Sequence, residues 1–115
     1  DWAEDAPGWT FVREHLRAAG RIARERGFDF VVTQYPSLER LDDGYPFRAE
    51  VDRLAAFCAS EGLPFLDLLE PLLGQDGAAL RVHVHDRHPG PTAHALVGRR
   101  LAERLADRLR PASAR

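Results

Sequence analysis

The sequence predicts an α/β fold in which helices pack against a parallel sheet. Segments with helical periodicity alternate with short apolar segments rich in aromatic and β-branched residues, an order typical of βαβ units. The apolar segments lack the strict alternation of a half-exposed strand, which suits strands buried on both faces of a parallel sheet. A helical segment long enough for a crossover connection separates the two clearest strands.

The first helix is predicted from about Pro7 to Arg26. Its apolar residues recur at intervals of three and four and therefore line one face of a helix; they are Trp9, Val12, Leu16, Ala19 and Ala23. Gly27 follows directly, and glycine is the residue that most readily ends a helix.

The first strand is predicted from Phe28 to Tyr35, followed by a surface loop from Ser37 to Pro46. In open α/β sheets, ligands bind beyond the carboxyl ends of the strands. Tyr35 and Ser37 are therefore candidates to line a pocket; the alternative is that they serve only the turn.

The second helix is predicted between Phe47 and Gly62, with an apolar face of Phe47, Val51, Leu54, Ala55 and Cys58. We expect Cys58 in the core, because free cysteine is among the most buried residue types. The second strand, Pro64 to Leu69, should lie parallel to the first. Asp67 interrupts it, and a local hydrogen bond is the simpler role for that carboxylate.

The last helix is predicted to begin at Pro91, after a connection from Glu70 to Leu80, and to end before Pro111. Its residues expected to face the sheet are Val97, Leu101, Leu105 and Leu109. Two parallel strands are too few to stand alone, so strands ahead of Asp1 are expected to complete the fold. Residues 1–110 would then be part of a single domain and residues 111–115 a frayed tail.

The composition excludes several classes of partner. The net charge is −2, and all 16 basic residues are arginines interspersed with acidic residues, which indicates a solvated surface and no nucleic-acid partner. No apolar run approaches the ~20 residues of a membrane-spanning helix, so no membrane span is expected. Cys58 is the only cysteine, and it leaves the cellular compartment undetermined.

Four of the five histidines lie between His83 and His94. Residues two apart in an extended backbone project to the same side. Asp86 can therefore bond one ring nitrogen of His88 and leave the other free as a general base, which is the orienting and proton-accepting half of a hydrolase triad.

The segment from Val84 to Pro89, together with Ala93-His94 and the amphipathic last helix, resembles the C-terminal block of the SGNH (GDSL-like) esterases. That family carries its catalytic Asp and His near the C-terminus, usually as D-x-x-H before proline. Asp86 and His88 match these two residues with a spacing one residue shorter, D-x-H. The upstream strands and helices also resemble the last βαβ portion of such an enzyme.

The resemblance implies the C-terminal half of a flavodoxin-like three-layer α/β/α sandwich with a parallel sheet. It implies hydrolysis of an ester, or acyl transfer, in which His88 is the base and Asp86 its orienting group, without a cofactor. His83 and His85 would lie near a small-molecule, carbohydrate or lipid ester. The sequence has no GDS-type serine motif and no Asn, so the family's nucleophile and oxyanion-hole residue have no counterpart here.

Two alternatives stay open at this point. The histidine cluster at residues 83, 85 and 88 with Asp86 suits zinc chemistry, although the order of ligands differs from that of metallo-β-lactamase-like hydrolases and no metal is expected. The second alternative is a non-catalytic interaction module or degenerate esterase. Because strands are expected to be missing from the sheet, we expect its open edge to be covered by an upstream part of the domain or by self-association.

Overall fold

The computed structural model describes residues 3–109, apart from the side chain of Asp107. It is a mixed α/β structure with two parallel strands, as predicted. The described chain separates into two compact units. One contains the residues up to Thr33 and Arg48–Leu66, and the other contains Gln34–Phe47 and the residues from Asp67 onward.

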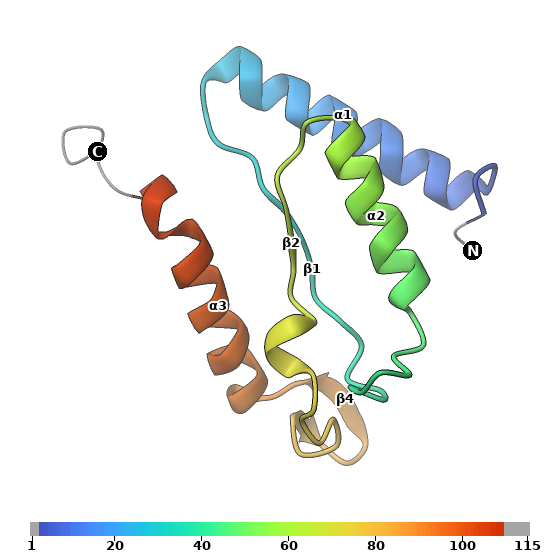
Figure 1. The fold of residues 1–115 in the computed structure, drawn as a ribbon, viewed down its shortest axis with the longest axis vertical. Helices are drawn as coiled ribbons and strands as arrows, with labels where there is room; N and C mark the ends of the chain where they lie inside the picture. Colours follow the sequence, from blue (N-terminus) through green and yellow to red (C-terminus); the bar gives the residue numbers. More distant parts are fainter. Residues whose placement is uncertain (1–2, 110–115) are drawn as a thin grey trace. The chain divides into compact units, whose positions relative to one another are not determined.

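The first unit is built from two helices and the beginnings of two strands. Helix α1 spans Pro7–Arg26 and helix α2 spans Arg48–Ser60. Strands β1, Val32–Gln34, and β2, Phe65–Asp67, are neighbours in a two-stranded sheet (Figure 1). The Val32 amide donates to the Pro64 carbonyl at 2.9 Å as the strands meet.

The core of the first unit lies where both helices meet the strands. Trp9 of α1 packs edge-to-face on Phe57 of α2, with ring centroids 5.6 Å apart. Cys58 is fully buried beside them, which confirms its predicted core position, and burial raises the pKa of its thiol. The Cys58 carbonyl accepts a 2.8 Å hydrogen bond from the Leu63 amide, so the end of α2 is joined to the start of the second strand.

Glycines end both helices of this unit, as the sequence predicts. Gly27 has a φ of 72° and its amide donates to the Ala23 carbonyl, and Gly62, just beyond α2, has a φ of 66°. These left-handed conformations cost glycine little because it has no Cβ. Arg17 of α1 also bonds Glu61 at 2.8 Å, which lowers the pKa of the Glu61 carboxyl.

The second unit contains a loop, a short 3₁₀ helix, a hairpin and the last helix. The 3₁₀ helix η1 spans Glu70–Leu72, strand β3 spans Arg81–His83, strand β4 spans Asp86–Pro89, and α3 spans Pro91–Leu109. Its buried apolar residues come from the loop, from η1 and its flanks, and from the start of α3; they are Leu38, Leu41, Tyr45, Leu68, Leu69, Leu72, Leu80, Ala93 and Val97.

Gly90 joins the hairpin to α3. Its amide donates to the Leu80 carbonyl at 2.7 Å, and its own carbonyl accepts from the His94 amide at 3.1 Å. A Cβ on Gly90 would lie 2.9 Å from the Arg81 carbonyl oxygen and 3.2 Å from that of Leu80. The close approach of two backbones therefore explains glycine at this position.

The sequence located the three helices to within a residue or two, but it overestimated both strands. Residues 28–31 and 35 lie outside strand β1, and residues 64, 68 and 69 lie outside strand β2. The β3–β4 hairpin was not predicted. Asp67 accepts a local 2.8 Å hydrogen bond from the Leu69 amide, as expected. Two residues predicted on buried helix faces are exposed. Phe47 precedes α2 and is 41% exposed, and Leu109 of α3 is 75% exposed. The predicted tail, with Ser113, lies outside the described residues.

No helix of the described chain has the length and apolarity needed to cross a membrane.

We expect Gly90→Ala to destabilise the fold by about 1–3 kcal/mol, because the new methyl group would press on two backbone carbonyls that have no side-chain freedom to move away. Gly98 is the matched control, since a Cβ there meets nothing within 4 Å. Gly98→Ala should stabilise helix α3 by about 0.5–1 kcal/mol. Urea unfolding followed by circular dichroism measures both, and the same sign for the two variants would contradict the packing role of Gly90.

Candidate active site

The β3–β4 hairpin carries the candidate catalytic residues. Its strands pair antiparallel, with Arg81 opposite Pro89 and His83 opposite Asp86, and a bulge lies between these two pairs. Val84 and His85 form the turn. The extended backbone of β4 places Asp86 and His88 on the same side of the strand, as their spacing predicted.

The Asp86 carboxylate holds both the ring and the backbone of His88. Asp86 Oδ1 lies 2.6 Å from His88 Nδ1 and 3.0 Å from the His88 amide nitrogen. A carboxylate oxygen can only accept, so Nδ1 carries the proton in this contact. The neutral ring then has a free lone pair on Nε2, which is the tautomer that a general base requires.

Asp86 stays ionised in this setting. The hydrogen bond from the His88 amide, followed by the bond from the His88 ring, holds the pKa of the Asp86 carboxyl below its ordinary value. Both bonds favour the charged form because the charged oxygen is the better acceptor.

The pair lies open to solvent in the described part of the chain. The His88 side chain is 87% exposed and that of Asp86 is 47% exposed. In a working Ser-His-Asp triad the aspartate is buried, and exclusion of water strengthens its charge. The local geometry of a base is therefore present without an enclosing pocket.

His83 and His85 lie at the tip of the same hairpin, and both are exposed. Their ring centroids are 5.5 Å apart, and the His85 amide donates to His83 Nδ1 at 3.3 Å. This nitrogen accepts, so a neutral His83 carries its proton on Nε2. The two rings therefore approach each other, and His83 lies opposite Asp86 in the hairpin.

Metal binding was the alternative reading of this cluster. Within residues 3–109, no group of three or more His, Cys, Asp and Glu side chains is arranged to hold a metal ion.

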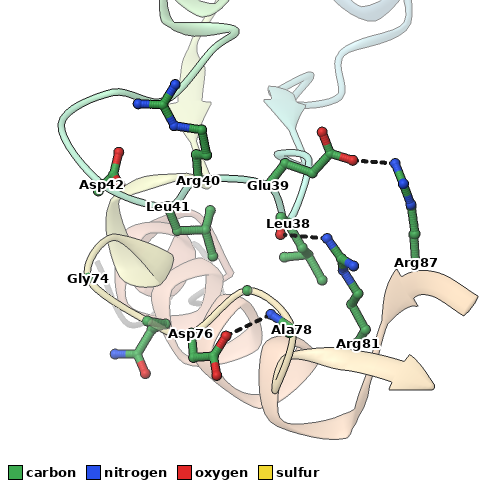
Figure 2. A pocket seen from close by; sticks show the side chains of 12 residues that line it. Leu38, Glu39, Arg40, Leu41, Asp42, Gly74, Asp76, Ala78, Arg81 and Arg87 are labelled. Carbon is green, nitrogen blue, oxygen red and sulfur yellow. Dashed lines mark hydrogen bonds and ion pairs between the residues drawn. The ribbon is translucent and has the colours of Figure 1, made fainter. Parts of the chain in front are cut away.

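A groove of about 670 Å³ lies beside the hairpin in the second unit. Figure 2 shows its walls, which come from the loop around residues 38–42, the turn around residues 74–78, and two arginines of the hairpin. Arg81 Nη2 donates to the Leu38 carbonyl at 3.3 Å, and Arg87 is paired with Glu39. Both arginines therefore tie the hairpin to the loop that follows β1.

The groove and the Asp86–His88 pair use opposite faces of β4. Arg87 lines the groove, whereas Asp86 and His88, the residues directly before and after it, do not. Side chains of successive residues in a strand point to opposite faces. A ligand in this groove would therefore lie behind the strand that presents the histidine base.

The other predicted site residues have structural contacts. The Ser37 amide donates to the Tyr45 hydroxyl at 3.0 Å, and neither Ser37 nor Tyr35 lines the groove. The Tyr35 ring packs edge-to-face on His94 at 5.8 Å, and burial raises the pKa of the Tyr35 phenol. The His94 amide bond to Gly90 places this residue in the first turn of α3.

Sequence reasoning missed the loop residues that form the groove. Asp42 and Asp76 accept from the amides of Gly44 and Ala78, two residues further on. These are turns of the kind that aspartate forms before small residues, so the turn pattern was the available signal. This pattern predicts each turn separately, but it does not predict that the two turns lie side by side and form a groove.

Comparisons of the chain with known protein families, with curated proteins and with solved structures find no match.

We expect the pKa of Asp86, measured by carboxyl carbon chemical shifts, to be lower in the folded protein than in the unfolded chain. The ionised carboxylate then contributes stability that is present above its unfolded-state pKa and is lost as the pH falls through the folded-state pKa. In His88→Ala the amide bond remains, so the pKa should rise but stay below its ordinary value. A normal pKa in the folded wild-type chain would contradict the geometry of this pair.

Proposed function

We propose that this chain supplies the base and the orienting carboxylate of a serine ester hydrolase resembling the SGNH enzymes, within a flavodoxin-like three-layer sandwich. One observation carries the proposal: Asp86 Oδ1 lies 2.6 Å from His88 Nδ1. The parallel strand pair and the helix that follows the Asp-x-His segment support the same assignment.

The proposed reaction is acyl transfer from an ester. His88 Nε2 takes the proton of a serine hydroxyl as the serine oxygen attacks the ester carbonyl, and it then gives that proton to the alcohol that leaves. Water hydrolyses the acyl-serine by the same proton transfers in the reverse direction. Asp86 keeps the ring in the required tautomer and stabilises the imidazolium that forms between the two transfers.

Asp86 and His88 supply neither the nucleophilic serine nor the oxyanion hole of the proposed reaction. The sequence contains no GDS-type serine motif and no Asn. The Ser60 hydroxyl donates to the Phe57 carbonyl at 2.8 Å within its own helix. The proposal therefore requires another segment of the polypeptide, or another chain, to place a serine oxygen near His88 Nε2 and to cover the exposed ring.

A non-catalytic interaction module is the second candidate. The 87% exposure of His88 favours it, because a base that is open to water gains little from a fixed tautomer. The two candidates differ in one respect that can be measured: only the enzyme depends on the His88 ring for turnover.

In a polypeptide or complex that supplies the serine, His88→Ala should abolish hydrolysis of a short-chain p-nitrophenyl ester while the circular dichroism spectrum is retained. Asp86→Asn should lower turnover by up to about four orders of magnitude, the effect of the comparable change in a serine protease. Arg87→Ala is the control, because this side chain lies on the opposite face of the same strand. Undiminished hydrolysis by folded His88→Ala would exclude the proposed role.

Residues 1–115 alone should show no esterase turnover above that of free imidazole, since the pair has no serine to activate. The assay compares this chain with the same chain carrying His88→Ala. Turnover that His88→Ala leaves intact and Ser37→Ala removes would show that the chain has a different active site of its own.

A further inference from the structure

Helix α1 has a second apolar face in addition to the one that enters the core. The first face contains Trp9 and Ala23, which are buried. The second consists of Phe11, His15, Ala18 and Ile22, whose spacing of four, three and four residues aligns them along one side of a helix. We call this set the outer stripe.

Phe11, His15 and Ile22 of the outer stripe are exposed, and Ala18 is half-buried. Phe11 is 60% exposed and Ile22 is 47% exposed, and within the unit that contains them α2 lies against the other side of α1 (Figure 1). Single exposed apolar residues need no explanation. Two large ones at opposite ends of a continuous stripe indicate a surface that another element covers.

The N-terminal half of the stripe is held in a fixed shape. The His15 ring stacks on the Phe11 ring with centroids 3.8 Å apart and an interplanar angle of 28°. His15 Nδ1 lies 2.8 Å from the Phe11 carbonyl oxygen, so it donates to that oxygen. Because these contacts already restrict both side chains, less rotational freedom is lost when the stripe is covered.

The stripe is complementary to an antiparallel copy of itself. Its midpoint lies between positions 16 and 17, so a copy running in the opposite direction places Phe11 opposite the partner's Ile22 and His15 opposite the partner's Ala18. Phe11 thus meets a large apolar side chain of the partner, and the imidazole of His15 meets the small methyl group of Ala18. A two-fold axis makes such a pair a closed dimer, so no copy of the stripe remains exposed to recruit a third chain.

The charges beside the stripe favour the same arrangement. Glu14 and Arg21 are seven residues apart and border the same edge of the stripe. When a two-fold axis perpendicular to the helices relates them, each edge of the stripe faces the same edge of the partner's stripe. Glu14 then lies near the partner's Arg21. Among the described residues, Arg21 makes an exposed 3.9 Å contact with Glu25, a weak pair that leaves the guanidinium able to bond elsewhere.

We propose that the outer stripe is a docking surface for a second copy of this chain, with the two α1 helices antiparallel. The proposal is independent of the esterase assignment and of the open sheet edge. One helix pair buries an area at the low end of specific interfaces, so the dimer should be weak and should dissociate on dilution.

Sedimentation equilibrium of the full chain at several concentrations tests the surface. The wild-type chain should show a reversible monomer–dimer equilibrium, and Phe11→Ser or Ile22→Ser should raise the dissociation constant at least about tenfold, because these two side chains supply most of the apolar area of the stripe. Val84→Ser is the control, because Val84 is 73% exposed on the hairpin and should have no effect. A monomer at every concentration, or a dimer that both stripe variants leave unchanged, would overturn the proposal.

Charge exchange tests the orientation without altering the apolar residues. Glu14→Arg and Arg21→Glu should each weaken self-association, because like charges then face each other across the seam. The double variant should restore it, and a mixture of the two single variants should form a heterodimer in preference to either homodimer. Single variants that associate like wild type, or a double variant weaker than both, would exclude the antiparallel pairing. Circular dichroism confirms that each variant is folded.

Discussion

The backbone hydrogen bond from the Gly90 amide to the buried Leu80 carbonyl, 2.7 Å long, determines where the candidate site lies. It closes the base of the β3–β4 hairpin and also starts α3, because the Gly90 carbonyl accepts the first bond of that helix from His94. Ala93, one residue before His94, is fully buried. A displacement of this junction would therefore move the hairpin and the helix together, which explains why a residue without a side chain occupies it.

The Asp86–His88 contact depends much less on tertiary structure than this junction does. Two residues on one side of a strand are close whatever surrounds the strand, and Asp86 is additionally bonded to the His88 amide. An exposed pair of this kind contributes little to stability. Its value for chemistry would depend on a neighbouring segment that removes water, because a charge in a dry site acts far more strongly than one in solvent. The local sequence thus sets the orientation of the His88 ring, whereas its effectiveness as a base depends on the segment that covers it.

Arginine ion pairs hold segments that are distant in the sequence. Arg87 reaches Glu39 and Arg100 reaches Glu70 in the second unit, and Arg17 reaches Glu61 in the first. In each pair at least one of the two side chains is largely exposed to solvent, so these pairs contribute little to stability. Their effect is on geometry: the planar guanidinium fixes the direction of approach. Apolar burial around Cys58 in one unit and Leu69 in the other supplies the larger stabilisation.

The sequence by itself determined the helices, their glycine ends and the contact between Asp86 and His88, because each depends on residues near one another in the chain. It also predicted the buried position of Cys58, because the helical periodicity puts this residue on the apolar face of α2. Only the tertiary structure decided how much of Phe28–Tyr35 pairs as strand, since pairing requires a partner that local pattern does not show. The hairpin around Val84 was missed because its exposed strands bury no apolar face. The groove near Arg81, and the exposure of Phe11 and His88, also depend on which segments fold against each other, and that choice is made by packing among residues far apart in the sequence.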